Sequence, residues 1–324
     1  MFGLLLAISL LAVVLSVRFG SVHLPREDFV AALLGRGSQG HHDILFQIRL
    51  PRVALGLLVG GGLALAGAVF QALLRNPLAE PFILGISGGA AAGAVGVIAL
   101  GLAAAGSALL PAAAFGGALL AIAMVFGVAA ATDQRLDVRV LLLAGVVVGA
   151  FFSATIAFIL SLSQAQAVRS ALLWMMGSLA GADWSMVAVV AAYTLPAVVV
   201  LLGLARPLNL MAIGEDTAAY LGADVERVKR VAYLVASLMT AAGVAMTGVI
   251  GFVGLIVPHG VRLLIGSDHR FLLPISFLAG AAFLVLADLF ARVVLAPVEI
   301  PIGVITAFLG VPLFLLLLRG SLER

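Results

Sequence analysis

The chain alternates long apolar runs with short polar connections. A helix needs about 20 apolar residues to cross the hydrocarbon core of a bilayer. Ten runs approach or reach this length, with 252–266 the shortest: 2–17, 53–73, 84–103, 108–130, 140–162, 186–204, 231–250, 252–266, 274–292 and 302–318. The pattern predicts an all-α, polytopic membrane protein with about ten transmembrane helices.

Two segments interrupt this pattern with polar residues, 18–49 and 205–230. In the second, Glu215, Ala218 and Gly222 follow an E-x-x-A-x-x-x-G spacing. One helical turn places the first two on one face, and the glycine ends the helix by accepting positive φ. This predicts a short polar helix suited to docking into a cleft of another protein. An ordinary solvated loop is the alternative.

Composition supports the membrane interpretation. The 324 residues are 64% hydrophobic and 10% charged, with a mean hydropathy of +1.26, which excludes a soluble globular domain. The absence of cysteine excludes disulfides and thiolate metal sites. The pI of about 9.9 reflects loop arginines and not a nucleic-acid surface. No internal boundary is visible, so residues 1–324 are predicted to form a single transmembrane domain.

Charge placement predicts the orientation. Counting spans from a cytoplasmic N-terminus puts the basic residues of 205–230 and Arg75 inside, as the positive-inside rule requires. Arg49, Arg52 and Arg292 then lie outside. Glycines at 56/60, 89/93 and 145/149 form GxxxG pairs, which we expect to pack helices closely within one subunit.

Few ionisable residues fall within the predicted spans. Asp288 precedes Arg292 by four residues, so the two share a helical face and are expected to pair. His259 beside a proline is expected to be structural, with a ligand or relay role as the alternative. Gln71, Ser87, Ser153 and Thr155 are candidates for a weakly polar conduit wall; Gln71 could equally hydrogen-bond a neighbouring helix. Such a wall suits a large solute with masked charge.

The chain carries no nucleotide-binding motif. A P-loop needs G-x-x-x-x-G-K-[ST], and the only lysine, Lys229, lies in VERVKRV. Energy must therefore come from another protein. Two alternatives remain. An ion-coupled secondary transporter would need charged groups at the midplane, and an intramembrane enzyme would need a convergent catalytic set. The sequence shows neither.

A series of ordered motifs resembles the FecCD family, the transmembrane subunits of ABC importers for iron–siderophores, haem and cobalamin. The motifs are RLPR at 49–52, RNPLAEP at 75–81, LLLAG at 141–145, WMMGSLAG at 174–181, NLMAIGEDTAAYLG at 209–222, GFVGLIVPH at 251–259, LADLFAR at 286–292 and EIPIGVITAFLGVPLF at 299–314. The resemblance covers nearly the whole chain.

The resemblance implies a type II importer permease in the bacterial cytoplasmic membrane. Two permease subunits, here expected as a homodimer, would surround a pathway lined by the spans at 140–162 and 302–318. Two cytoplasmic ATPase subunits would bind ATP and Mg, and a periplasmic binding protein would deliver the substrate. No cofactor is expected in this chain. A ferric siderophore is the first expected substrate, with haem or cobalamin as the alternative.

The resemblance also assigns roles to residues. It implies that Glu215, Ala218 and Gly222 couple the permease to the ATPase. Asn76 and Leu78, in the turn after the second span, match positions that close the cytoplasmic mouth. Arg49, Arg52 and Arg292 match positions that accept glutamates of the binding protein, since arginine grips carboxylates with two hydrogen bonds. Snorkelling to headgroups or an Asp288–Arg292 pair is the competing account.

Overall fold

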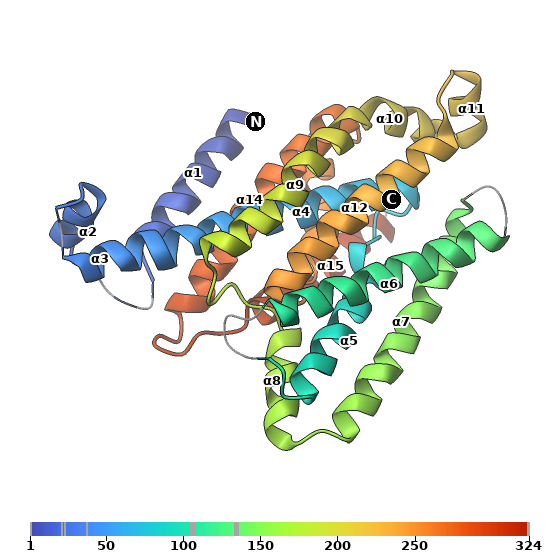
Figure 1. Cartoon of the computed structure of the whole chain (residues 1–324). Helices are drawn as coiled ribbons and strands as arrows, with labels where there is room; N and C mark the ends of the chain where they lie inside the picture. The colour runs from blue at the N-terminus through green and yellow to red at the C-terminus, as the bar shows by residue number, and fades with distance from the viewer. Residues whose placement is uncertain are drawn as a thin grey trace.

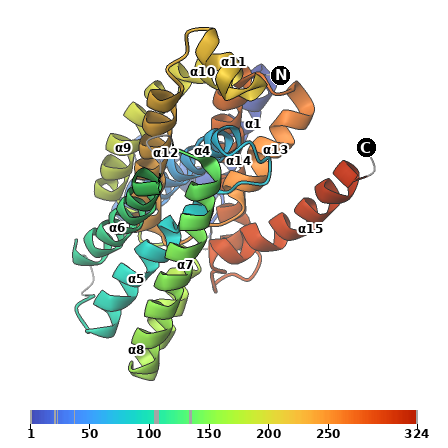
Figure 2. The same ribbon diagram turned by 90° about the vertical axis from the view of Figure 1, so that its right-hand side faces the viewer.

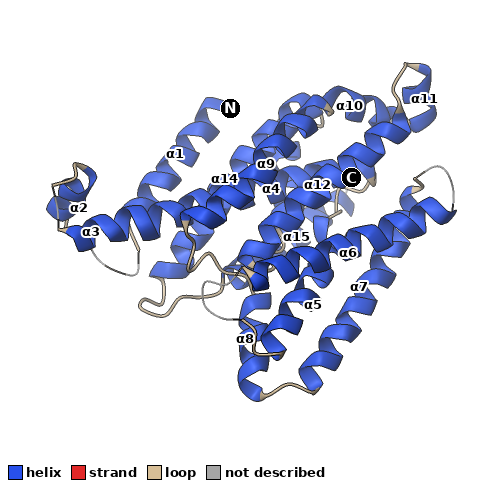
Figure 3. Ribbon diagram, in the orientation of Figure 1, coloured by secondary structure: helices blue, strands red, loops and turns tan. Residues whose placement is uncertain are grey.

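The computed structural model describes residues 2–20, 22, 24–36, 38–103, 108–132 and 136–322, and every regular element in these ranges is helical (Figure 3). The elements are α1 (Phe2–Arg18), α2 (Arg26–Leu33), α3 (Gln39–Asp43), the π-helical η1 (Ile44–Arg49), α4 (Leu50–Leu73), the 3₁₀-helical η2 (Pro81–Leu84), α5 (Ile86–Ala99), α6 (Leu109–Thr132), α7 (Val138–Ser161), α8 (Ala165–Met175), α9 (Trp184–Gly203), α10 (Ala205–Ile213), α11 (Glu215–Tyr220), α12 (Val225–Thr247), α13 (Val253–Ile265), α14 (His269–Val293) and α15 (Ile302–Leu322).

The ten predicted spans correspond to α1, α4, α5, α6, α7, α9, α12, α13, α14 and α15. In the described ranges, six apolar helices are long enough to cross a membrane, and α1, α5, α13 and α15 contribute shorter apolar stretches. The expectation that 252–266 is short is confirmed by the 13 residues of α13. The run 84–103 was predicted as a full span, but α5 has only 14 residues because left-handed Gly85 precedes it and left-handed Gly101 follows it.

The central helix of the bundle is α4, which α12, α13 and α14 surround (Figures 1 and 2). Glycines allow these helices to approach closely. A methyl group added at Gly60 would lie 2.4 Å from the carbonyl oxygen of Gly280 in α14. The pair Gly89 and Gly93 contacts α6 in the same way, with 2.3 Å to Gly117 O and 2.1 Å to Ala113 O. Close packing within one subunit is therefore confirmed for these glycines.

The polar segment 18–49 contains helices that the hydropathy pattern did not predict. The short helices α2 and α3 lie at the end of the molecule opposite α11 (Figure 1). Through η1, α3 continues without a break into α4, so one helical stretch runs over Gln39–Leu73. These short helices are polar and lie outside the apolar core, so a search for long apolar runs does not detect them.

The helix α15 leaves the bundle at an angle, whereas α7 runs along one side of it (Figure 2). Both helices present large apolar side chains outward, including Val146 and Phe158 on α7 and Phe308 on α15. The start of α15 is fixed to the end of α8, because Gly303 N donates to Met176 O at 2.9 Å and Ile302 N donates to Gly177 O at 3.2 Å. Of the described side chains of α15, Phe308, Leu309 and Leu315 are more than half exposed.

Candidate functional site

The helix α11 projects from one end of the bundle between α10 and α12 (Figure 1). Two backbone bonds close its C-terminus, Gly222 N to Ala219 O and Ala223 N to Ala218 O, each 2.9 Å. Together with φ of +86° at Gly222, these bonds form a Schellman stop. The predicted short helix and its glycine stop are confirmed.

The faces of α11 differ from the prediction. Ala218 has no exposed surface, and Glu215 turns toward α12, where it pairs with Lys229. Both predicted contact residues therefore face their own subunit, and the prediction that Ala218 lies on a docking face is wrong. The exposed face carries Tyr220, which is 93% exposed, with Ile213 and Leu221 beside it.

Lys229 is the centre of a charged cluster at this end. The side chain is only 4% exposed, and its ammonium group donates to Glu215, to Glu226 at 3.5 Å and to the carbonyl oxygen of Leu136 at 3.0 Å. Glu226 in turn accepts from Leu136 N at 3.0 Å. Sequence analysis assigned Lys229 no role, although a lone lysine in so apolar a chain was a usable signal. We call Lys229, Glu215, Glu226, Arg75 and Leu136 the lysine hub.

The turn after α4 joins this hub. Arg75 Nη2 lies 3.6 Å from Glu215 Oε1, so the turn with the predicted gate residues contacts α11 directly. Asn76 Oδ1 accepts the backbone N–H of Leu78 at 2.9 Å, which closes an Asx turn. Leu78 is half-buried. The structure therefore brings together Glu215 and the gate turn, which the sequence motifs treat separately.

The same turn reaches α13 through Glu80. Its Oε1 accepts the backbone N–H of Phe252 at 2.6 Å, at the start of α13. Gln71 is buried and donates to the carbonyl oxygens of Gly254 and Leu255, while its own oxygen accepts from Arg262 at 2.8 Å. The alternative that Gln71 bonds a neighbouring helix is confirmed, and it does not line a conduit.

The predicted docking arginines lie at the opposite end, and all three are buried. Arg52 binds both oxygens of Asp288 and both oxygens of Glu299, with Nη2 2.8 Å from Asp288 Oδ1 and 3.0 Å from Glu299 Oε2. Arg292 Nε lies 2.9 Å from Asp288 Oδ2. We call Arg49, Arg52, Arg292, Asp288 and Glu299 the arginine cluster.

The remaining donors of this cluster bind α1 and the segment after it. Arg49 donates to the carbonyl oxygens of Val17 and Arg18, each at 2.9 Å, and Arg292 donates to Ser16 Oγ at 2.6 Å. The Asp288–Arg292 pair predicted as the competing account is confirmed. The docking role of these arginines stays a prediction; in this structure their guanidinium groups bind partners within the chain that are distant in the sequence.

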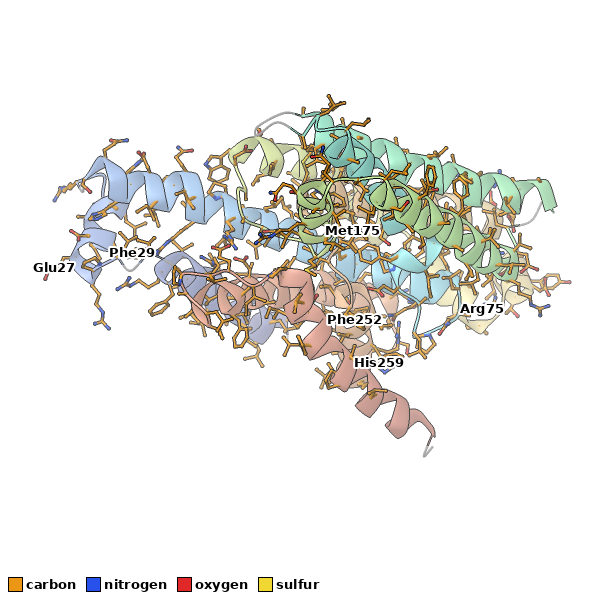
Figure 4. All side chains as sticks on the ribbon, turned by 90° about the horizontal axis from the view of Figure 1, so that it is seen from below. Glu27, Phe29, Arg75, Met175, Phe252 and His259 are labelled. Atoms are coloured by element: carbon orange, nitrogen blue, oxygen red, sulfur yellow. The ribbon has the colours of Figure 1, made fainter. Side chains whose placement is uncertain are left out.

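An apolar groove of about 580 Å³ lies between the end of α8, the loop before α13 and α15. Met175 and Phe252 face it near the middle of the molecule (Figure 4), and Ala307, Phe308 and Val311 of α15 complete its wall. Ser87, Ser153 and Thr155, the candidates for a weakly polar conduit wall, are not among the described residues that line this groove, so their role stays a prediction. Within the described residues, no group of three His, Cys, Asp or Glu side chains could hold a metal ion.

Comparison with known proteins supports the interpretation of this fold. The profile of the FecCD transport family matches residues 6–320. The cobalamin import permease BtuC of Halobacterium salinarum is 46% identical over 282 residues, covering 87% of this chain and 74% of the relative. The hemin transport permease HmuU of Yersinia pestis is 42% identical over 287 residues, covering 87% and 84%.

A solved structure gives the same result for the fold. It is an inward-facing ABC transporter that is provisionally assigned to the metal-chelate type. The two chains superpose with a TM-score of 0.84 at 32% identity, and the match covers 98% of this chain and 97% of the other. The type II importer permease fold and its ten membrane helices are thus confirmed. The permease of such an importer works with a separate ATPase and is not itself one. The chain belongs to the FecCD transport family, as a multi-pass membrane permease subunit of an ABC importer.

Proposed function

We propose that this permease carries a tetrapyrrole metal chelate, cobalamin or haem, into the cytoplasm. Relatives at 40–46% identity are named for these two substrates. The observation that carries the proposal is the apolar groove between α8 and α15. A wall of methionine, phenylalanine and alanine cannot replace the hydration shell of a bare ion, so the metal has to arrive inside a ligand that masks its charge. The sequence-based preference for a ferric siderophore is retained as a competing substrate.

The test is uptake by the reconstituted importer. The permease, its ATPase and its binding protein are placed in liposomes, and ATP-dependent accumulation of cobalamin, haemin and a ferric hydroxamate is measured. We expect accumulation of one tetrapyrrole chelate, and none when the ATPase cannot hydrolyse ATP. Uptake of the ferric hydroxamate alone would contradict the tetrapyrrole proposal while leaving the importer intact.

The segment 205–230 is proposed to dock into the ATPase through the exposed face of α11. Tyr220 at the end of α11, Leu221 after it and Ile213 at the end of α10 are large apolar residues exposed on an otherwise polar segment. Exposed apolar side chains of this kind are typical of protein interfaces. The double variant Tyr220→Ser and Leu221→Ser should reduce the amount of ATPase that co-purifies with the permease. The exposed but polar Thr217, changed to alanine, is the matched control and should retain the ATPase.

The turn 75–81 is proposed to close the cytoplasmic mouth between two permease copies, with Asn76 holding its shape and Leu78 forming the contact. Because the chain has no cysteine, Leu78→Cys introduces a single thiol in each copy. Disulfide cross-linking of a homodimer through this position should stop uptake, and reduction should restore it. Transport by the cross-linked protein would mean that the gate lies elsewhere.

A binding protein is proposed to dock at the opposite end, over the arginine cluster. Glu299 is the member of this cluster with the most exposed side chain, so a carboxylate of the binding protein could reach Arg52 only by replacing Glu299. Reversing Arg49 and Arg52 to glutamate would place negative charges beside buried Asp288 and damage the fold. That variant therefore cannot test docking, and substitutions of Glu299 are better suited.

A further inference from the structure

We propose that Glu215 and Lys229 are positioning residues that connect the coupling helix α11 to both pathway helices. One branch runs through Leu136 to α7. The other runs through Arg75, Glu80 and Phe252 to α15. The inference rests on the proposed function, in which α11 contacts the ATPase. It names the side chains through which a displacement of α11 by the ATPase would reach α7 and α15.

The branch to α7 is short and buried. Lys229 Nζ donates to Leu136 O at 3.0 Å, and Leu136 N donates to Glu226 Oε2 at 3.0 Å. Leu136 is thus held at both its backbone groups by side chains of α12. Since α7 begins at Val138, a displacement of Lys229 acts directly on the first turn of α7.

The branch to α15 passes through the gate turn. Glu215 Oε1 lies 3.6 Å from Arg75 Nη2, at the start of the turn. Pro77, Pro81 and the Asx turn at Asn76 stiffen the turn. At its far end Glu80 holds the backbone N–H of Phe252 at 2.6 Å. Phe252 packs on the backbone of α15, because a methyl group at Gly310 would lie only 2.7 Å from Phe252 Cβ.

Two residues of this second branch have a strained backbone conformation. Among the residues that the structure describes, Arg75 and Phe252 are the two non-glycine residues with positive φ, at +46° and +68°. Such conformations are costly for residues with a Cβ and persist where the surroundings impose them, often at sites that move. Arg75 lies at the start of the turn, and Phe252 is bonded to Glu80 near its end, which fits a segment held between two packed elements.

The two branches differ in strength. Lys229 is buried, so separating its ammonium group from Glu215 and Glu226 would leave an uncompensated buried charge. We therefore expect Lys229 and α11 to move together. The side chain of Arg75 is 46% exposed, and exposed pairs are weak. This pair can open and close as α11 is displaced, so it is the contact that the ATPase can switch.

The test uses the complete complex with its ATPase and binding protein. Lys229→Met keeps the apolar stem and removes the charge, and Glu215→Gln keeps the shape and removes the charge. Each should leave complex assembly and ATP hydrolysis in place but lower uptake by about 5- to 150-fold, the usual range of coupling between sites. The double variant should lose less uptake than the product of the two single losses, because the two substitutions share the Lys229–Glu215 contact.

Arg227→Gln and Arg75→Lys are controls for general damage, and Arg75→Gln is a further test. Arg227→Gln removes an exposed positive charge from the same helical turn and should leave uptake unchanged. Arg75→Gln should lower uptake without affecting folding, since the residue is on the surface, and Arg75→Lys should restore it. Wild-type uptake in Lys229→Met, Glu215→Gln and Arg75→Gln would overturn the inference.

A distance measurement separates this inference from the choice of substrate. Spin labels at the exposed positions Asp137 and Arg206, on cysteines introduced into the cysteine-free chain, report the position of the start of α7 relative to α10. ATP binding should change this distance in the wild type but not in Lys229→Met. An equal change in both, or no change in the wild type, would overturn the α7 branch. Failure of the wild type to take up any tested chelate, with the ATP-induced change intact, would count against the proposed function alone.

Discussion

The two charged clusters at opposite ends of this permease both pair basic with acidic side chains but have different physical consequences. In the arginine cluster, Asp288 is bound by two guanidinium groups, and the side chains of all three are at most 9% exposed. Among the four charged side chains of the lysine hub, only Lys229 is deeply buried, while Glu215, Glu226 and Arg75 remain partly exposed. The first cluster joins α1, α4 and α14 permanently, whereas the second can exchange partners at its surface.

The difference shows that a charged motif does not identify its own role. Arginine forms bidentate bonds with any carboxylate within reach, and a carboxylate of the same chain is available first. The partners of Arg52 lie 236 and 247 residues away in the sequence. Two carboxylates that bind an arginine within one subunit stabilise the fold of that subunit. A charged side chain has to remain partly exposed to form a contact with another protein.

The strongest test of this contrast is Asp288→Asn. Two buried guanidinium groups would lose their shared carboxylate, and breaking a buried pair typically costs about 3–5 kcal/mol. We expect a large fall in the thermal unfolding temperature of the detergent-solubilised permease. Glu215→Gln should cost far less, about 1 kcal/mol or below, because Lys229 keeps Glu226 and the carbonyl of Leu136. Equal losses for the two variants would remove the distinction between the clusters.

A second test concerns the end of α11. Valine at position 222 would have to adopt the left-handed conformation that Gly222 has, at a cost of about 1–2 kcal/mol. Gly222→Val should therefore displace α11 and uncouple ATP hydrolysis from uptake while the bundle stays folded. Asparagine tolerates this conformation, so Gly222→Asn should retain coupling. Normal uptake by the valine variant would count against a coupling role for this segment.

A third test separates the exposed edge of the arginine cluster from its centre. Glu299 has a partly exposed side chain, so Glu299→Gln should change stability by only about 0.2–1 kcal/mol. Arg52 remains bound to Asp288 in this variant. A loss as large as that of Asp288→Asn, measured by the same thermal unfolding, would mean that the whole cluster acts as one buried unit.

The smallest expected effect is a pH dependence at the contact between α10 and the start of α14. Bonds from the backbone N–H of Arg270 and from the side chain of Asn209 lower the pKa of Asp268, which joins α10 to the start of α14. A lowered carboxyl pKa contributes stability above the unfolded value of about 3.9, and this contribution is lost as the pH falls through the folded value. Hydrogen exchange of α10 should rise below about pH 4 in the wild type, and Asp268→Asn should remove this pH dependence.

Sequence analysis predicted the elements of the fold better than their contacts. Hydropathy located all ten apolar helices and the E-x-x-A-x-x-x-G spacing located α11, because both signals depend on neighbours within a few residues. The reduced length of α5 was missed. Hydropathy does not report that a left-handed glycine lies on either side of this helix, Gly85 before it and Gly101 after it. The inward orientation of Ala218 and the burial of Arg49 were also missed, because both depend on helices distant in the sequence.

The contacts of α4 also determine where this chain can vary. A side chain at Gly60 or Gly67 would collide with a neighbouring backbone, at 2.4 Å from Gly280 O and 1.8 Å from Gly254 O. Gly127 and Gly149 have nothing within 4 Å of the same added atom in this chain. Glycines that look equivalent in the sequence therefore divide into sites where substitution is barred and sites that a single permease copy leaves open, so a saturation mutagenesis map of the glycines would mark the close helix contacts without a structure.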